Sequence, residues 1–395
     1  METTNADSIG HTNPKNMSKR IVYIVGDLSY PNGMSRVLSQ KVNYLARHTD
    51  YELNVVLTEK ASKPWYYQLE SNIKYVNFDL NFDDLYQMPL YRRLVAYRKK
   101  QSQYRRLLTD YLMEVRPDIT VSVMRREINF INDIKDGSRK VGEIHFNKQT
   151  YRVFEKSFLP NFVNHFITNR WQKSLEKEVR RLSKFVVLTN EDYGFWQGFT
   201  NITIIPNPIS FFPERHSDCQ SKQVIAVGRY TYQKGFDLLI KAWKIVHEHH
   251  PDWQLNIYGP GNREEYQREA DALRLSQTVH CHEAAANIYD RYAEHSIFVL
   301  SSRFEGFGLV IAEAMATGLP AISFSCPCGP ADIITDHQDG LLVENGNIDG
   351  LAKAISYLIE HPEKRQQMGW QAVVSAQRYR ENTIMQQWIQ LFNNL

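Results

Sequence analysis

Long hydrophobic runs are missing from the sequence. The longest apolar segments, such as "SIFVLSS" and "FVVLT", fall far short of the roughly 20 residues that a helix needs to cross a bilayer, so we expect no transmembrane helix. The start, "METTNADSIGHTNPKNMSKR", is polar and lacks the apolar region of a secretory signal. We therefore predict that residues 1–18 form a disordered tail, in which Met17 is an alternative start.

Cysteine is scarce and the charge is balanced. The 4 cysteines, Cys219, Cys281, Cys326 and Cys328, form no CxxC pair, which excludes a disulfide framework and favours a reducing compartment. The segments "SCPCGP" and "HCH" lack the second half of a zinc site, so no metal site is expected. With 47 basic and 44 acidic residues the net charge is +3, which is too small to indicate nucleic-acid binding by composition.

The sequence does contain a regular alternation of strand-like and helix-like segments. Apolar runs such as "IVYIVGD", "YELNVVLT" and "DITVSVM" alternate with helical patterns such as "VLSQKVNYLARH". The alternation pauses at "NITIIPNPISFFPERHSDCQSK" and restarts with "QVIAVGRY" and "WQLNIYGPG". This pattern predicts two doubly wound α/β domains with parallel sheets, at 19–205 and 223–378, and a linker at 206–222.

Loops that follow strands are the expected ligand sites, because ligands of doubly wound sheets bind at the carboxyl ends of the strands. Two such domains facing each other would form a cleft between these loops. The closing segment, residues 379–395, has the pattern of one more amphipathic helix and need not belong to the second domain.

The loop after the first strand, "GDLSYPNGMSRV", does not contain GxGxxG, which argues against a nicotinamide dehydrogenase. Its Gly33 lies near the start of a helix, where it would let a phosphate approach the backbone. A simple turn glycine is the alternative interpretation.

Two cations follow the first strand of the second domain. Arg229 and Lys234 are five residues apart in "GRYTYQKGFD", before a helix. A forked guanidinium and the point charge of an ammonium suit a diphosphate. Since any exposed loop can hold such residues, a solvated pair of charges is the alternative.

A loop with repeated glycine carries two glutamates. In "SSRFEGFGLVIAEAM", Gly306 and Gly308 permit close backbone approach, and the helix that follows would point free N–H groups at an anion. Glu305 precedes this helix and Glu313 lies inside it, so the two carboxylates do not share a helix face. We interpret them as separate acceptors for hydroxyls spaced along one elongated ligand. The alternative is that Glu313 caps a helix or forms an ion pair.

A histidine follows a strand of the first domain, in "EIHFN". His145 could donate a hydrogen bond to an oxygen across the cleft or act in proton transfer. A structural histidine is the alternative interpretation.

Taken together, these loops resemble the retaining glycosyltransferases of family 4, which have the GT-B architecture, and in particular those of bacterial surface-polysaccharide assembly. The resemblance rests on "VGRYTYQKGFDLLIKAW" and on "SSRFEGFGLVIAEAMATGLPAISF", where Glu305 and Glu313 match the Glu-x7-Glu motif of that family. With "IIPNPI" and "DGLLVENG" it covers most of residues 200–350, and it is thinner over the first half. It implies two doubly wound domains that face each other across a cleft, with the C-terminal helix crossing back to the first domain.

The resemblance also implies a division of labour, in which the second domain binds a nucleotide-activated sugar and the first domain binds the acceptor. By position, Arg229 and Lys234 would hold the diphosphate, Glu313 the ribose hydroxyls and Glu305 the donor sugar. The other implied donor-binding residues are Gly33, in the loop that closes over the phosphates, Ala284, beside the base, and Gly306, Phe307, Gly308 and Leu309 around the sugar. Two positions depart from the family pattern: Asn32 replaces one of two adjacent glycines, and Asp332 stands where glutamate is common.

The chemistry implied is transfer without a metal or other cofactor, with Glu305, His145, Arg229 and Lys234 as the catalytic residues. The leaving diphosphate gains charge, which fixed cations and a helix N-terminus can stabilise. No residue is an evident nucleophile, so the working hypothesis is retention by attack on the same face, with the leaving phosphate deprotonating the acceptor hydroxyl. We predict a hexosyltransferase-type enzyme that uses a nucleotide-diphosphate sugar, with a UDP-sugar as the expected donor.

Rival interpretations are a non-catalytic GT-B protein that binds nucleotide sugar as a partner subunit, and another GT-B chemistry such as epimerisation. For the transferase, we expect a glycan or polyprenyl-linked oligosaccharide acceptor in lipopolysaccharide or capsule synthesis, and no nucleic-acid partner.

A basic segment in the first half bears on the location of the protein. Residues 91–108, "YRRLVAYRKKQSQYRRLL", hold seven Arg or Lys interleaved with Tyr, Leu and Val. Such a helix can lie on an anionic membrane surface, and an ordinary solvated helix is the alternative. A second basic stretch, "NRWQKSLEKEVRRLSK", lies in the same half. We predict a cytoplasmic protein that is peripheral on the inner face of the cell membrane.

Overall fold

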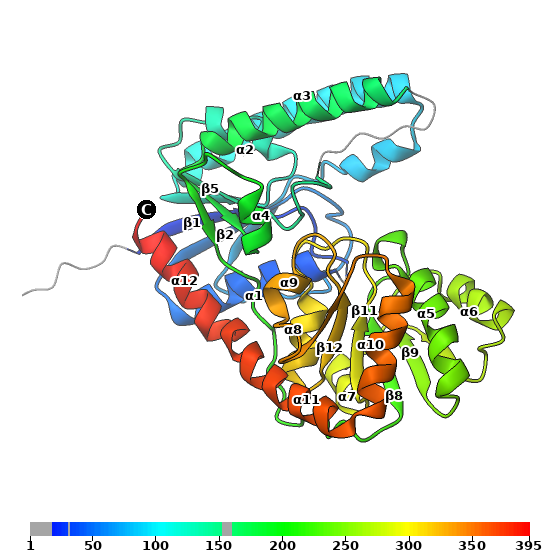
Figure 1. Ribbon diagram of the computed structural model, residues 1–395. Coiled ribbons are helices and arrows are strands. Elements are labelled where there is room, and N and C mark those ends of the chain that lie inside the picture. Colours follow the sequence, from blue (N-terminus) through cyan, green and yellow to red (C-terminus); the bar gives the residue numbers. More distant parts are fainter. Residues whose placement is uncertain (1–17, 31, 152–159) are drawn as a thin grey trace, which may run out of the picture.

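The chain forms two parallel α/β domains, described here from a computed structural model (Figure 1). The structure describes residues 18–30, 32–151 and 160–395, so residues 1–17 of the predicted tail lie outside the described residues. The first sheet has the order β3-β2-β1-β4-β5-β6-β7 and the second β10-β9-β8-β11-β12-β13, with every neighbouring pair of strands parallel. The prediction of two doubly wound domains is confirmed.

The first sheet and its helices come before residue 205, apart from one late helix. The strands are β1 Arg20–Ile24, β2 Glu52–Leu57, β3 Lys74–Asn77, β4 Ile119–Ser122, β5 Arg139–Glu143, β6 Lys184–Val187 and β7 Ile202–Ile204. The helices are α1 Gly33–His48, α2 Leu90–Val115, α3 Asn161–Arg180 and α4 Asn190–Gly194.

The second sheet begins after the segment 205–222. Its strands are β8 Gln223–Val227, β9 Gln254–Tyr258, β10 Val279–His282, β11 Ile297–Leu300, β12 Ala321–Phe324 and β13 Gly340–Val343. Its helices are α5 Phe236–His249, α6 Arg263–Ala272, α7 Ile288–Ala293, α8 Leu309–Ala316, α9 Pro330–Ile333, α10 Ile348–Glu360 and α11 Pro362–Ala376, and α12 Glu381–Asn393 ends the chain.

Local sequence explains where α1 begins and which face it buries. The Asn32 side chain accepts a hydrogen bond from the Ser35 amide at 2.9 Å, which caps the helix. Leu38, Val42 and Leu45 recur at helical spacing and are buried against the first sheet. The helix therefore starts directly after the β1 loop, and its first turn lies beside the carboxyl ends of the strands.

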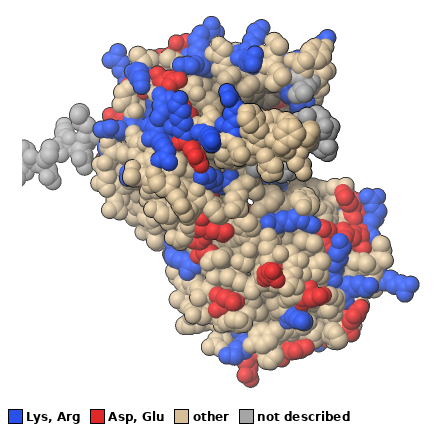
Figure 2. All heavy atoms as spheres, turned by 45° about the horizontal axis from the view of Figure 1, so that its top comes forward, with Lys and Arg blue, Asp and Glu red and all other residues tan. Residues whose placement is uncertain are grey.

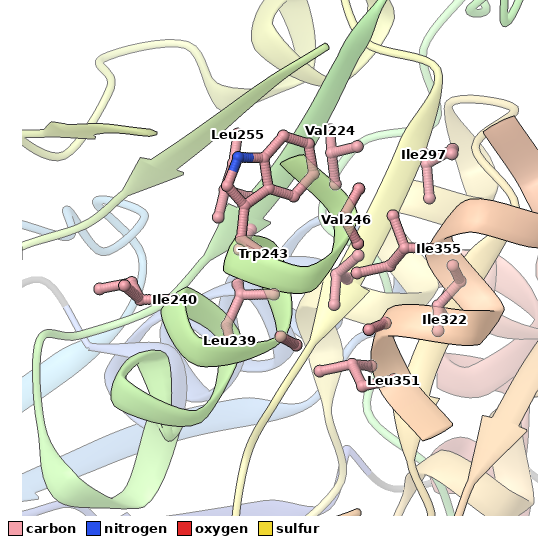
Figure 3. Close-up of a cluster of buried hydrophobic side chains, with 14 of the residues drawn as sticks. Val224, Leu239, Ile240, Trp243, Val246, Leu255, Ile297, Ile322, Leu351 and Ile355 are labelled. Atoms are coloured by element: carbon pink, nitrogen blue, oxygen red, sulfur yellow. The ribbon is translucent and has the colours of Figure 1, made fainter. Parts of the chain in front are cut away.

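The second domain has a core on each side of its sheet. Figure 3 shows one of them, where Trp243 and Val246 of α5 meet Leu255 of β9 and Ile355 of α10. Strands buried on both faces read as continuous apolar runs, which is why short segments such as "SIFVLSS" predict them. Removal of a buried tryptophan side chain such as Trp243 is expected to cost about 3–5 kcal/mol.

The C-terminal helix α12 crosses back to the first domain, as predicted (Figure 1). Its residues Ile384, Met385, Trp388 and Phe392 are buried in the same cluster as the β1 and β2 side chains. The Phe392 ring lies edge-on to Tyr23, with 6.4 Å between the ring centroids. The end of the chain thus closes the core of the domain that begins it.

No helix among residues 18–30, 32–151 and 160–395 is long and apolar enough to span a membrane.

Candidate functional site

The loop between β11 and α8 brings the second domain against the first. A Cβ atom on Gly306 would lie 2.3 Å from the backbone oxygen of His145, so only glycine fits without displacement. Gly308 has a φ of +89° and directly precedes α8. In the described part of the chain, the backbone N–H groups of Phe307, Gly308 and Leu309 have no acceptor. These free donors lie at a helix N-terminus, which favours an anion.

Glu305 is held in this loop by a cation and a hydroxyl. Its carboxylate accepts from the Lys234 ammonium at 2.6 Å and from the Ser302 hydroxyl at 2.6 Å. The Lys234 side chain lies along the backbone of Gly228, directly after β8. Because β8 and β11 are neighbouring strands, their loops meet at the carboxyl edge of the sheet. The structure therefore joins two predicted site residues from different motifs.

Arg229 is not brought into this pair. It is exposed, and its guanidinium makes a long hydrogen bond of 3.4 Å to the Gln233 side chain. The nearby Arg303, which the sequence did not single out, donates to the Asp237 carboxylate at 2.9 and 2.7 Å and to the Tyr232 carbonyl oxygen at 2.7 Å. Arg229 thus remains the less engaged of the two arginines beside this loop.

Glu313 forms an ion pair between the two domains. Its carboxylate, on α8, pairs with the guanidinium of Arg36 on α1. Burial raises the pKa of Glu313, and the Arg36 charge opposes that rise. The structure therefore shows the ion pair that the sequence left open as the alternative for Glu313. Sequence reasoning missed Arg36, although its place one turn after Gly33 puts it beside the same loop.

His145 contacts a buried cluster of charged residues that come from segments far apart in the sequence. Its Nε2 atom lies 3.1 Å from the Glu143 carboxylate, which also pairs with the Lys41 ammonium of α1. The Lys41 nitrogen in turn lies 3.6 Å from the ring centroid of Trp388 on α12. Lys41, Glu143 and Trp388 are all buried. The cluster thus fixes the strand end that carries His145.

Both charges of this cluster persist near neutral pH. Burial lowers the pKa of Lys41 to about 8, with Glu143 opposing the shift. Burial alone would raise the pKa of Glu143, but the Lys41 charge and then His145 hold it at about 2. The sequence did offer a signal for Lys41, since a lysine inside the apolar stripe of a helix needs a buried partner.

The remaining predicted positions lie around this region. Apart from its chain neighbours and the backbone of its own helix, no described atom lies within 4 Å of a Cβ built on Gly33, so the position is open. Ala284 is exposed in the loop after β10. The Phe307 side chain is buried against Tyr379, with 5.5 Å between the ring centroids, so only its backbone can face a ligand. Leu309 is half-buried.

Asp332, the departure from the family pattern, is used between the domains. Its carboxylate accepts from the Asn190 backbone amide at 2.8 Å and from the Asn190 side-chain amide at 2.7 Å, at the start of α4. A carboxylate there matches the positive end of the helix. Asp332 therefore contacts the first domain at the start of α4.

Metal chemistry has no obvious protein ligands here. Within residues 18–30, 32–151 and 160–395 there is no group of three or more His, Cys, Asp or Glu side chains that could hold a metal ion. The charges available to an anion at this site are Lys234, Arg229, Arg36 and backbone N–H groups.

Comparison with known proteins points to one class. Residues 210–373 match the family model described as "Glycosyl transferases group 1". An uncharacterized glycosyltransferase of Haemophilus influenzae is 33% identical over 56% of this chain and 65% of its own length. The amylovoran biosynthesis glycosyltransferase AmsD of Erwinia amylovora is 30% identical over 53% of this chain and 62% of its own. The matched regions thus span less than two thirds of either relative.

Solved structures extend the likeness over nearly the whole chain. The crystal structure of S. aureus TarM has a TM-score of 0.75 and 16% identity, covering 95% of this chain and 99% of TarM. Anabaena HepE, solved with UDP and glucose, has a TM-score of 0.71 and 16% identity, covering 95% of this chain and 100% of HepE. At this identity the likeness shows the fold, which is GT-B.

Proposed function

We propose that this protein is a retaining glycosyltransferase of family 4 that moves a hexosyl unit from a UDP-sugar to a glycan or polyprenyl-linked oligosaccharide. The observation that carries the proposal is the joining of Lys234, Glu305 and three free backbone N–H groups at one edge of the second sheet. A cation, an acceptor and a helix N-terminus at one place suit a sugar diphosphate. The Glu305–Gly306 turn also contacts the His145 loop of the other domain.

The proposed roles are those that the family resemblance implies for each residue. Glu305 accepts from a hydroxyl of the donor sugar, while Lys234 and Arg229 hold the diphosphate. Glu313 accepts from the ribose hydroxyls, in exchange for part of its pairing with Arg36. Ala284 lies beside the base, and Gly33 leaves room for the phosphates. His145 donates to the donor sugar from the first domain.

The proposed reaction exchanges one bond at the anomeric carbon. The bond from that carbon to the diphosphate oxygen breaks, and its electron pair leaves with the diphosphate. The acceptor oxygen bonds to the same face of the carbon, and its proton passes to the leaving phosphate. Lys234, Arg229 and the free N–H groups stabilise the charge that develops on the diphosphate, so no metal is required.

The setting that we propose is surface polysaccharide synthesis, of the lipopolysaccharide or capsule type, at the cytoplasmic side of the cell membrane. The match to AmsD, named for amylovoran biosynthesis, supports a polysaccharide product. The HepE complex with UDP and glucose supports UDP as the nucleotide.

A panel of donors tests the proposal. The purified chain is incubated with UDP-, GDP- and ADP-sugars, with and without a polyprenyl-linked acceptor, and release of the nucleoside diphosphate is followed with and without EDTA. We expect slow hydrolysis of a UDP-sugar, faster release with acceptor, no effect of EDTA, and a product of unchanged anomeric configuration by NMR. Binding without turnover of any donor would favour the non-catalytic partner subunit instead.

A further inference from the structure

The N-terminal halves of α2 and α3 extend beyond the core of the first domain. From Tyr91 onward, the first buried side chain of α2 is Tyr104, and the first buried side chain of α3 is Leu175. Before them, residues 91–103 and 161–174 are exposed or half-buried. Figure 1 shows both helices along the top of the view, each beginning at its right-hand end. Asp133 accepts from Arg105 of α2 and from Arg181 at the end of α3, which also places the two helices together.

Large apolar side chains on these two helix halves face solvent. The exposed fractions are 66% for Tyr91, 57% for Leu94, 70% for Val95, 75% for Phe162 and 67% for Phe166. Their spacing places Tyr91, Leu94 and Val95 on one side of α2, and Phe162 and Phe166 on one side of α3. A gathered set of exposed aromatic and aliphatic side chains marks an interaction surface.

The charge of the same segments has one sign. Residues 86–109 and 160–175 contain no Asp or Glu. Among their cations, Arg92, Arg98, Lys99, Arg170 and Lys173 have no carboxylate partner in the described part of the chain. Figure 2, in which the top of Figure 1 comes forward, shows Lys and Arg side chains gathered over the first-domain half of the molecule.

The combination of exposed apolar side chains and cations without a described carboxylate partner favours one kind of binding partner. A second copy of the chain would bring the same cations face to face, which disfavours a symmetric dimer here. Nucleic acid would use the cations and leave Leu94 and Val95 exposed to water. An anionic bilayer satisfies both features, because its headgroups attract Lys and Arg while its interface takes up aromatic and aliphatic side chains.

We propose that the N-terminal halves of α2 and α3, residues 91–103 and 161–174, together form a docking surface for an anionic lipid bilayer. The predicted role of residues 91–108 is thereby extended to a second helix, whose Phe162 and Phe166 insert beside Tyr91, Leu94 and Val95. Docking would bring the first domain to a lipid-linked acceptor, a consequence that rests on the proposed function. Lipid binding itself does not depend on transfer.

The structure also refines which cations matter for docking. Arg93 donates to the carbonyl oxygens of Tyr86 and Met88, and Lys100 donates to those of Leu80 and Asn81. These two cations hold the segment that precedes α2 in place, so their reversal would disturb the fold. Arg92, Arg98 and Lys99 are exposed and are the cations to change.

Sedimentation with vesicles tests the surface. The full chain is mixed with vesicles of phosphatidylcholine alone, or of equal parts phosphatidylcholine and phosphatidylglycerol. Two variants are compared with the wild type: Phe162→Ser/Phe166→Ser and Arg92→Glu/Arg98→Glu/Lys99→Glu. Matched controls in the second domain are Trp370→Ser, whose side chain is 70% exposed, and Lys244→Glu/Arg268→Glu/Lys364→Glu.

We expect the wild type and both controls to sediment with the anionic vesicles only, and each test variant to bind at least about tenfold more weakly. The proposal is overturned if the wild type stays in solution, if the controls lose binding equally, or if the same variants instead abolish self-association or RNA binding without affecting vesicles. Hydrolysis of donor without vesicles should be unchanged in all variants. A lack of hydrolysis in the wild type would count against the proposed function and leave the vesicle result independent.

Discussion

The two halves of the candidate site hold their charged pairs in different ways. In the second domain, the Lys234 and Glu305 side chains are 12% and 8% exposed, and they come from loops after two neighbouring strands. In the first domain, the Lys41 and Glu143 side chains are 1% and 0% exposed, beneath Trp388 from the end of the chain. A ligand can reach the first pair and cannot reach the second. The difference separates groups that bind from groups that hold a binding group in place.

The largest expected effect comes from breaking the buried ion pair of Lys41 and Glu143. Lys41→Met or Glu143→Gln alone leaves a buried charge without its partner, so each should lower the free energy of unfolding by about 3–5 kcal/mol. The double variant removes both charges and should be more stable than either single variant. Urea denaturation measures all three. If the losses of the two single variants simply add in the double variant, the pair is not coupled as described.

Breaking the ion pair of Lys234 and Glu305 should lower the rate of transfer rather than the stability. Lys234→Met and Glu305→Gln should each lower kcat by about 100-fold or more, because they remove groups that meet the donor. Donor turnover measures the loss, and circular dichroism checks the fold. Asp237→Asn is the matched control, since it breaks the nearby partly exposed pair with Arg303. Equal losses in the control and test variants would contradict a specific role for Lys234 and Glu305.

Acid should weaken the buried Lys41–Glu143 pair of the first domain. The pKa of Glu143 is about 2 in the folded chain, below its ordinary value of 4.5, so the folded state binds fewer protons. Its stabilising contribution is complete above pH 4.5 and is lost as the pH falls toward 2. We expect this window to contain on the order of 3 kcal/mol in the wild type and much less in Glu143→Gln. Urea midpoints measured across the window show whether the two proteins converge.

The contact between the domains gives a smaller effect. Gly306→Ala would place a methyl group against the His145 carbonyl oxygen. We therefore expect the free energy of unfolding to fall by about 1–3 kcal/mol and kcat to be lower.

Gly33→Ala, at an open position in the first turn of a helix, should change stability by less than about 0.5 kcal/mol. Thermal unfolding and donor kinetics compare the two. A greater loss of stability in the Gly33 variant than in the Gly306 variant would contradict the account, in which Gly306 lies in a tight contact and Gly33 at an open position.

The sequence indicated the pair of Lys234 and Glu305, but it did not indicate the buried cluster of Lys41, Glu143 and Trp388. The motifs around Lys234 and Glu305 are local, since each is a strand, a loop and the start of a helix, and parallel strands bring such loops together. The doubly wound domains follow from the same alternation. Lys41, Glu143 and Trp388 meet only through tertiary packing of α1, β5 and α12. Only the lysine in the apolar stripe of α1 gave a local sign of that cluster.

The sequence did not predict the roles of Arg36 and of the α3 aromatic residues, because both roles depend on the tertiary fold. Nothing local pairs Arg36 with Glu313, because the ion pair exists only once the domains face each other. Phe162 and Phe166 have the pattern of core residues in a helix, and only the folded chain leaves them exposed. The roles of Glu305, Glu313 and the other implied donor contacts stay predictions that the geometry supports.

Calorimetric titration of the wild type with UDP and with 2′-deoxy-UDP tests the central claim most directly. If the second domain holds a nucleotide through Lys234 and its ribose through Glu313, UDP should bind and the deoxy analogue should bind about tenfold more weakly or worse, since a hydrogen bond to a carboxylate is lost. Equal affinity for the two ligands, or no binding of UDP, would contradict the account.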